Sequence, residues 1–333
     1  MKIKWGVIGA GGFADKRSLP GMREARNCEL TAVMVRNLDR AKKLAKKHGA
    51  SKFYDKVEDL FKDEEIDAVY IATPVYLHKE HTIMAANYGK HVLCEKPMAM
   101  NTKECEEMIK ACQDNKVKLM IGFMKRFHPF HQQIKRLIDE GKIGQIVEIR
   151  CQLHLWYPDT PGAWRQNPTL GGGGCLMDVG SHCIDLLCFL VGDVTEVMAR
   201  AENVIFNYPV EDISTLILKF STGAQGIVDT SFSIPYRENP VEIYGTRGTI
   251  LAFRTMGPFN NPHAKMITEN REEELKIPYT HDVYQAEFEH FAQCIQKNTP
   301  PLISGEDGLK NIQIIQAAYA SAKEGKIVKI SNN

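Results

Sequence analysis

The sequence lacks an excess of charge of either sign. Its 333 residues include 42 Lys and Arg against 41 Asp and Glu, which argues against a nucleic-acid or membrane-surface partner held by bulk charge. No apolar run approaches the length that spans a bilayer, and residues 1–12 lead directly into a strand and a glycine loop rather than an apolar secretory segment. We therefore predict a cytoplasmic protein with neither a membrane nor a nucleic-acid partner.

The chain also lacks the cysteine patterns of a metal site or a disulfide framework. Its nine cysteines form no Cys-x-x-Cys pair and stand mostly among apolar residues. Their odd number, without a secretory segment, predicts reduced thiols. Internal repeats and low-complexity segments are absent as well. At this length two domains are expected.

The pattern of the chain changes near residue 122. Before it, short apolar segments alternate with amphipathic ones, which predicts a doubly wound parallel α/β sheet in a domain of residues 1–122. After it, strands joined by turn residues predict an α+β domain of residues 123–333 with an open, mostly antiparallel sheet, one face of which is bare. The expected strands lie at 3–8, 29–35, 67–72, 91–94 and 117–122, and then at 146–156, 194–204, 214–220, 224–234, 241–245 and 249–254; the expected helices lie at 12–25, 38–48, 56–63, 77–88, 102–115, 127–140, 283–297 and 306–323.

The first chemical motif is "GAGGFA", Gly9 to Ala14, which follows a strand and opens a helix. In that context Gly9 allows a tight turn, and Gly11 lets the backbone approach a pyrophosphate at the helix amino terminus. The small Ala14 permits close packing of the helix on the strand. The alternative is a plain tight turn between strand and helix, but the spacing favours a dinucleotide site.

The second motif is "CEKPMA", in which Glu95 and Lys96 end a short apolar strand and Pro97 follows at once. Ligands bind beyond the carboxyl ends of strands in an open α/β sheet. Most Glu-Lys pairs in loops are solvated ion pairs. Here Pro97 restricts the backbone of Lys96, which favours a chemical role for this lysine.

The third motif, "GGGGCLMDVGSHCIDLL" from Gly171, precedes an apolar helix. Asp178, His182 and Asp185 are spaced i, i+4 and i+7 and are expected on one face. His182 could be a core histidine bonded to Asp178, a metal ligand or a proton-transfer residue. No third ligand has matching spacing, so a metal is disfavoured and none is predicted, and Asp185 is interpreted as structural.

Two nearby patterns carry weaker signals. The four glycines have no following Lys-Ser/Thr, so we interpret them as a flexible segment that lets a ligand approach rather than a phosphate loop. The pair His128 and His131 in "HPFH" lacks the glutamate of a zinc helix and is interpreted as ordinary helix surface.

Together, "GAGGFA", "CEKPMA" and "GGGCLMDVGSHCIDLL" resemble the Gfo/Idh/MocA family, in the same order and over nearly the whole chain. In detail, Trp164-Arg165 ahead of the glycines resembles the 1,5-anhydrofructose reductase and dihydrodiol dehydrogenase branches. The resemblance implies an amino-terminal Rossmann domain, a carboxyl-terminal α+β domain whose open sheet commonly packs on another subunit, and an NAD(P)-dependent oxidoreductase acting on CH-OH or C=O groups.

The resemblance also implies roles for individual residues. Lys96, His182 and Asp178 match the family's catalytic positions. The implied cofactor-binding residues are Gly9, Gly11, Gly12 and Phe13 in the glycine loop, Thr73, Pro74 and His78 after the strand at 67–72, and Glu95, Lys96, Trp164, Arg165 and Tyr284.

The expected chemistry follows from hydride transfer to a carbonyl, which leaves negative charge on oxygen and requires a proton donor. We expect His182 to donate the proton, Lys96 to stabilise the oxyanion and Asp178 to orient one of them. The reverse assignment, with Lys96 as donor and His182 positioning the substrate, stays open. His154, Tyr157, Asp159, Tyr236 and Arg237 are further candidates for binding hydroxyl groups.

The end of the second strand bears on the choice of cofactor. An NAD site usually has an acid there to bind the ribose hydroxyls, but this position is Val35, followed by Arg36 and Asn37, with Arg40 one turn later. These residues could hold a 2′-phosphate. We predict NADP(H) as the preferred cofactor, with NAD(H) possible.

Two other functions fit the same fold: a non-catalytic dinucleotide sensor, and a glycosidase that uses NAD without net redox turnover. The sensor would not need the Lys, Asp and His residues that this sequence has. The predicted partners are a small carbonyl or hydroxyl substrate and a second copy of the chain, in a homodimer or homotetramer built on the second domain's sheet.

Overall fold

The computed structural model describes residues 1–257, 261–277 and 282–330. The chain folds into two compact units. Unit 1 consists of Met1–Met124 and Thr280–Lys310, and unit 2 of Lys125–Tyr279 and Asn311–Asn333. A late segment thus groups with the first part of the chain. The division into domains at 1–122 and 123–333 stays a prediction.

Unit 1 is built on a six-stranded parallel sheet with the order β3-β2-β1-β4-β5-β6. The predicted doubly wound sheet is confirmed. The short edge strand β3 is absent from the prediction because three residues carry too little pattern. The strands are β1 (Ile3–Ile8), β2 (Cys28–Met34), β3 (Lys52–Tyr54), β4 (Ala68–Ile71), β5 (His91–Glu95) and β6 (Leu119–Gly122).

The helical segments of unit 1, apart from α9, follow the carboxyl ends of these strands. Because the strand order reverses between β1 and β4, the ends of β1, β4 and β5 form the edge where α/β sheets bind ligands. The helical segments are the π-turn η1 (Ala14–Ser18), α1 (Leu19–Glu24), α2 (Leu38–His48), α3 (Val57–Lys62), η2 (Val75–Leu77), α4 (His78–Asn87), α5 (Thr102–Asp114) and α9 (Val283–Lys297).

Aromatic packing joins α9 to the sheet of unit 1. Trp5, Tyr70 and Phe288 are fully buried, and the Phe288 ring meets Trp5 and Tyr70 edge to face, with centroids 5.2 Å apart in each pair. Such pairs stabilise a core beyond the burial of their area. This packing explains why a helix near the end of the chain groups with unit 1.

Unit 2 is built on a nine-stranded sheet with the order β14-β13-β12-β11-β7-β10-β9-β8-β15. All neighbours are antiparallel except β7 and β10, which run parallel. The six expected strands are present, and three more polar or shorter ones extend the sheet at its edges. The strands are β7 (Ile146–His154), β8 (Val194–Glu202), β9 (Ile213–Phe220), β10 (Gln225–Ser231), β11 (Val241–Gly245), β12 (Gly248–Phe253), β13 (His263–Thr268), β14 (Arg271–Glu274) and β15 (Val328–Lys329).

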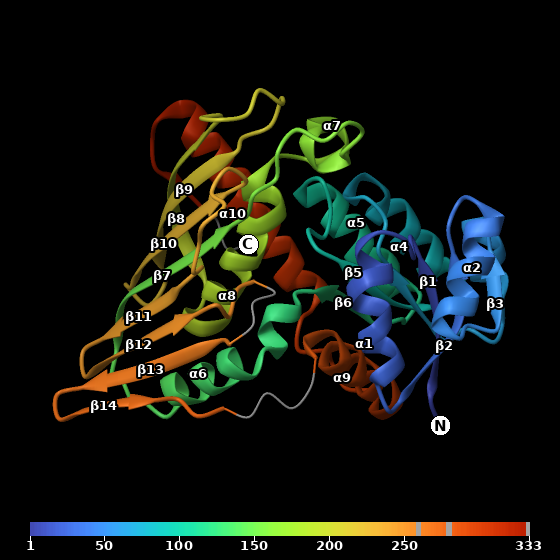
Figure 1. The fold of residues 1–333 in the computed structure, drawn as a ribbon, viewed down its shortest axis with the longest axis horizontal. Helices are drawn as coiled ribbons and strands as arrows, with labels where there is room; N and C mark the ends of the chain where they lie inside the picture. The colour runs from blue at the N-terminus through green and yellow to red at the C-terminus, as the bar shows by residue number, and fades with distance from the viewer. Residues whose placement is uncertain (258–260, 278–281, 331–333) are drawn as a thin grey trace. The chain divides into compact units, whose positions relative to one another are not determined.

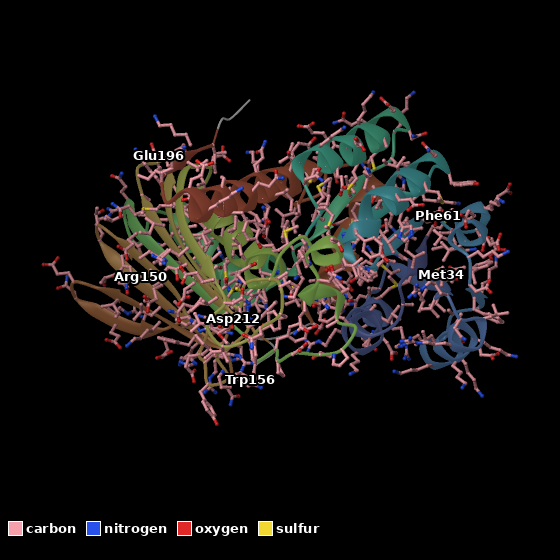
Figure 2. All side chains as sticks on the ribbon, turned by 90° about the horizontal axis from the view of Figure 1, so that it is seen from above. Met34, Phe61, Arg150, Trp156, Glu196 and Asp212 are labelled. Atoms are coloured by element: carbon pink, nitrogen blue, oxygen red, sulfur yellow. The ribbon has the colours of Figure 1, made fainter. Side chains whose placement is uncertain are left out.

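Helices lie along one face of this sheet (Figure 1). The other face carries the alternate residues of the strands, which are exposed on β9 and half-buried on β11 and β12. Arg150 on β7 and Glu196 on β8 lie on that outer face and are labelled in Figure 2. The helical segments associated with unit 2 are η3 (Met124–Phe127), α6 (Pro129–Asp139), η4 (Trp164–Gln166), α7 (Pro168–Gly171), the π-turn η5 (Leu176–Gly180), α8 (Ser181–Val191) and α10 (Gly305–Glu324).

The apolar segment from α7 to α8 corrects one sequence expectation. Residues Pro168–Val191 are long and apolar enough, by length and composition, to cross a membrane, whereas the sequence pattern predicts no such run. However, 78% of the most apolar window of this segment is buried inside the structure, as in the core helix of a globular protein.

Candidate active-site residues

The glycine loop after β1 has the geometry that a dinucleotide-binding turn requires. Gly9 and Gly12 have φ angles of +75° and +56°, which side-chain-bearing residues rarely adopt. A Cβ on Gly9 would lie 2.6 Å from the carbonyl oxygen of Ala72, just after β4. The loop therefore lies tightly against the end of the neighbouring strand β4. It leads directly into η1, so the backbone N–H groups of the loop are near the start of this helical segment.

The end of β2 places positive charge beside this loop. Arg40, on α2, is so close to Gly11 that a Cβ built on Gly11 would be 2.5 Å from the Arg40 Nη2 atom. Asn37 caps α2 by accepting a hydrogen bond from the Arg40 backbone nitrogen at 2.9 Å. Val35 is half-buried, whereas Arg36, Asn37 and Arg40 are exposed. A guanidinium next to a glycine that approaches phosphate fits an anionic dinucleotide.

The segment after β4 is tied to the segment after β5 by His78. Its Nε2 lies 2.8 Å from the carbonyl oxygen of Thr73, and its Nδ1 lies 3.0 Å from that of Pro97. Burial lowers the pKa of His78 to about 4, so the ring is neutral near pH 7 and donates to one of these oxygens at a time. The predicted cofactor residue His78 is thus a buried link, whereas Thr73 and Pro74 are half-buried.

Lys96 follows β5 and is half-buried, with a cis peptide bond to Pro97. Its backbone nitrogen donates to Oε2 of Glu95 at 3.2 Å. The Oε1 atom of Glu95 accepts a short hydrogen bond from the Tyr70 hydroxyl, and Ser18 Oγ lies 2.8 Å from the same hydroxyl oxygen. The segment carrying Lys96 is therefore anchored to β4 and to η1. No sequence pattern signals the roles of Tyr70 and Ser18, because each falls inside an apolar or helical segment.

Tyr284 lies beside the glycine loop although it is far away in the sequence. Its ring meets Phe13 edge to face at 5.9 Å, and a Cβ on Gly21 would lie 2.6 Å from the Tyr284 Cβ. Tyr284 is 3% exposed, whereas Phe13 is 48% exposed. Burial is the main reason that the pKa of Tyr284 is well above its usual value.

In unit 2, Asp178 lies on the π-turn η5 and His182 on the first turn of α8. Asp178 Oδ1 accepts a hydrogen bond from Arg165 Nε at 3.2 Å, and the guanidinium of Arg165 stacks on the Trp164 ring, 4.2 Å from its centroid. His182 is buried. Tyr157 belongs to the same group: its pKa is raised, mainly by burial, and the charges of Arg165 and Asp178 act on it. Four predicted residues therefore come from two neighbouring segments of unit 2.

The glycine run before η5 is packed rather than flexible, contrary to our expectation. A Cβ on Gly174 would lie 2.1 Å from the carbonyl oxygen of Glu211, and one on Gly173 would lie 1.9 Å from the Tyr319 hydroxyl. The buried carboxylate of Glu211 accepts hydrogen bonds from the backbone nitrogens of Gly174 at 3.0 Å and Leu176 at 2.9 Å, and from the Tyr319 hydroxyl at 2.8 Å. The run is glycine because two other segments occupy the space.

The remaining candidates from the apolar helix and from the "HPFH" pair are buried inside unit 2. Asp185 forms a buried ion pair with Arg126, at 2.7 Å, which agrees with its interpretation as structural. His128 and His131 are buried, so their interpretation as helix surface was wrong. Nδ1 of His131 lies 2.8 Å from the Lys125 carbonyl oxygen, and Nε2 lies 3.0 Å from Thr255 Oγ1. The alternation of apolar residues does not reveal that this helix face is covered.

The candidates for hydroxyl binding differ in their surroundings. His154 is buried and lies 3.3 Å from the Asp229 carboxylate, whereas Tyr236 is 94% exposed. Arg237 donates to the Pro235 carbonyl oxygen. Within the described residues, no group of three or more His, Cys, Asp or Glu side chains could hold a metal ion.

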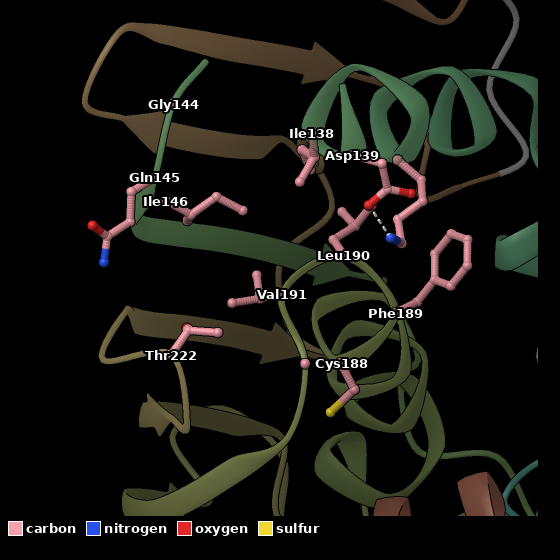
Figure 3. Close-up of a pocket in the computed structure, with 12 residues that line it drawn as sticks. Ile138, Asp139, Gly144, Gln145, Ile146, Cys188, Phe189, Leu190, Val191 and Thr222 are labelled. Carbon is pink, nitrogen blue, oxygen red and sulfur yellow. Dashed lines mark hydrogen bonds and ion pairs between the residues drawn. The ribbon is translucent and has the colours of Figure 1, made fainter. Parts of the chain in front are cut away.

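Figure 3 shows a hollow of about 360 Å³ in unit 2. It is lined by the end of α6, the end of α8 and the start of β7, and none of the predicted catalytic or cofactor residues borders it. His182 is at the opposite end of α8 from the lining residues Cys188–Gly192. The hollow therefore gives no support to the predicted catalytic residues.

Comparison with known proteins bears on the family. Residues 3–123 match the model of an oxidoreductase family with an NAD-binding Rossmann fold, and residues 131–251 match a Gfo/Idh/MocA carboxyl-terminal domain. The chain is 29% identical to a 1,5-anhydro-D-fructose reductase of Ensifer adhaerens, over 98% of each protein. It is 32% identical to a scyllo-inositol 2-dehydrogenase (NADP(+)) of Bacillus subtilis, over 89% of each.

A solved structure agrees with these relatives. A levoglucosan dehydrogenase in complex with NADH is 25% identical and superposes with a TM-score of 0.91, covering 100% of both chains. Two family models match, and the relatives match along nearly the full length of the chain. The chain also has the motifs of the glycine loop, Glu95-Lys96-Pro97 and Asp178/His182. The chain belongs to the Gfo/Idh/MocA family of oxidoreductases, and its first unit has the family's NAD-binding Rossmann fold.

Proposed function

We propose that the protein transfers hydride between a nicotinamide cofactor, preferably NADP(H), and a carbonyl or hydroxyl carbon of a sugar, a polyol or a related small molecule. The observation that carries this proposal is the position of Lys96 at the end of β5, on the ligand edge of the parallel sheet. Hydrogen bonds hold the backbone on both sides of it, through Glu95 before it and through the Pro97 carbonyl oxygen after it. The relatives named for anhydrofructose and scyllo-inositol support the class of substrate.

The residues of the glycine loop fit a dinucleotide. Gly9 and Gly12 have positive φ angles, and the space where a Cβ of Gly12 would lie is open. The guanidinium of Arg40 next to Gly11 supplies positive charge for a pyrophosphate. When bound, the nicotinamide would supply or accept the hydride. Phe13 and Tyr284 would border the loop side of that cofactor, and Thr73, Pro74 and Glu95 the side nearer Lys96.

The chain itself would manage charge and proton transfer at the substrate oxygen. Lys96 would stabilise the oxyanion as it develops, and His182 would donate the proton. Asp178, which accepts a hydrogen bond from Arg165, would hold Arg165 and the adjacent Trp164 ring in position and balance the positive charge nearby. Lys96 as donor, with His182 positioning the substrate, is the second assignment.

Steady-state oxidation of NADPH and NADH with a panel of keto-sugars and dicarbonyls tests the activity. Net change in nicotinamide absorbance separates an oxidoreductase from a dinucleotide sensor and from a glycosidase without redox turnover.

Lys96→Met should lower kcat on the order of 100-fold or more and leave dinucleotide binding largely intact. Lys79→Met is the control, because Lys79 forms a partly exposed ion pair with Glu107 on the helices α4 and α5. Wild-type turnover by Lys96→Met would refute the role of this lysine.

The proton donor is tested separately. His182→Ala should lower kcat and remove a titrating limb from its pH profile if His182 is the acid. An unchanged profile with residual activity would assign the proton to Lys96.

We also propose that the outer face of the nine-stranded sheet joins two copies of the chain. Met198, Ile217 and Ile227 are cross-strand neighbours in one row on this face, and Met198 and Ile217 are 46% and 52% exposed. An apolar row on an open sheet is typical of a self-complementary interface. Sedimentation at micromolar concentration should give a dimer or tetramer. The nine cysteines form no disulfide and eight of them are buried, which supports a cytoplasmic location.

A further inference from the structure

A buried chain of hydroxyl groups lies behind Lys96. Ser18 and Tyr70 are both 0% exposed, and their hydroxyl oxygens are 2.8 Å apart. Tyr70 has one hydroxyl proton, which it donates to the Glu95 carboxylate. Ser18 must therefore donate to the Tyr70 oxygen, so that the chain runs in one direction from Ser18 through Tyr70 to Glu95. Hydrogen bonds in such a row strengthen one another.

This row of hydrogen bonds ends at the peptide nitrogen of Lys96. Glu95 uses one carboxylate oxygen for Tyr70 and the other for the backbone nitrogen of Lys96. The far side of the same segment is held independently, where His78 faces the Pro97 carbonyl oxygen at 3.0 Å. The Tyr70 ring is itself fixed by its edge-to-face packing on Phe288. Rigid groups thus hold both ends of the dipeptide Lys96-Pro97.

We propose that Tyr70, supported by Ser18, is a positioning residue that acts through Glu95 to fix the side chain of Lys96 for reaction. The inference rests on the proposed function, because it gives Lys96 the role of stabilising the substrate oxygen. Tyr70 remains a donor throughout, since burial and the neighbouring Glu95 raise its pKa well above its usual value. A catalytic group must be held within a fraction of an ångström of its productive position.

Tyr70→Phe tests this role, because it removes the hydroxyl and keeps the buried ring. On the panel carbonyl with the highest kcat/KM, kcat should fall about tenfold, the loss expected for one hydrogen bond to a charged group. The dissociation constant for NADPH, measured by fluorescence, should stay within about twofold. Tyr54→Phe is the matched control, since the Tyr54 hydroxyl also donates to a carboxylate, Asp63, at 2.9 Å on the edge strand β3. It should leave kcat unchanged.

A double-mutant cycle with Lys96→Met separates positioning from general destabilisation. If Tyr70 acts through Lys96, its substitution should have no further effect on the residual rate of Lys96→Met. A tenfold loss in both backgrounds, or no loss in the wild-type background, would overturn the inference. Wild-type turnover by Lys96→Met would instead overturn the proposed function. Should Tyr70→Phe not fold, Ser18→Ala gives the same test, with a smaller fall in kcat expected and an unchanged kcat overturning the inference.

Discussion

Replacing Gly174 with alanine should destabilise unit 2 strongly. The new methyl group would lie 2.1 Å from the Glu211 carbonyl oxygen, far inside ordinary van der Waals distance, so the chain around residue 174 must move. Such a movement breaks the hydrogen bonds that the backbone nitrogens of Gly174 and Leu176 donate to the Glu211 carboxylate at 3.0 and 2.9 Å. Each hydrogen bond to a charged group contributes about 1.5–3 kcal/mol, which gives a loss of about 3–6 kcal/mol.

The assay is a thermal melt of the full chain, followed by circular dichroism. For a unit of this size, roughly 2–4 °C is lost per kcal/mol, so the melting temperature of unit 2 should fall by roughly 6–24 °C. Gly180→Ala, in the π-turn η5 that follows, is the control, because its methyl group would most closely meet the flexible Leu176 side chain, at 2.9 Å. Activity should fall as well, since the carbonyl oxygen of Gly174 accepts from the Asp178 nitrogen at 3.0 Å. A Gly174→Ala protein as stable as the control would show that the glycine run is flexible after all.

Three further predictions follow from other parts of the molecule. Burial lowers the pKa of His131 to about 3 from 6.5, so the folded state favours the neutral ring. The contribution of His131 to stability should be full above pH 6.5 and fall by about 1.4 kcal/mol per pH unit toward pH 3. His131→Gln should reduce that slope in urea titrations, whereas an equal slope would refute the assignment. Arg36→Ala should weaken NADPH binding by about tenfold or more and leave NADH unchanged, with Arg23→Ala as an exposed control; fluorescence titrations that give equal affinities for the two cofactors in the wild type would rule out a phosphate site. Ile217→Lys should convert the oligomer to monomers in sedimentation, and a monomeric wild type would contradict the interface.

The parallel sheet was predictable because its strands are buried on both faces and separated by amphipathic helices. Apolar segments such as 67–72 and 91–94 stand out against their flanking polar residues. The edge strands were not predictable for the opposite reason. Arg271–Glu274 is a run of four charged residues, and only its pairing with β13 makes it a strand.

The candidate residues could be named from sequence, but not the interactions that position them. Motif spacing indicates Lys96, Asp178 and His182 because glycine and proline mark unusual backbone nearby. Nothing in the order of residues shows that Tyr70 reaches Glu95, or that Glu211 lies under the glycine run, since each interaction joins segments that are distant along the chain. The interpretation of the glycine run failed for this reason: a glycine that provides flexibility and one that avoids a collision look the same in sequence.

The two border strands of the nine-stranded sheet bear on the proposed pairing of two copies of the chain. The last strand on one side, β14, is short and has the sequence Arg-Glu-Glu-Glu, and the last on the other side, β15, has two residues. Short, charged border strands discourage a neighbouring chain from adding its own backbone to the ladder. Growth of the sheet into fibrils is therefore disfavoured at both borders. The self-association that we propose would use the outer face of the sheet, where a symmetric pairing can close instead of propagating.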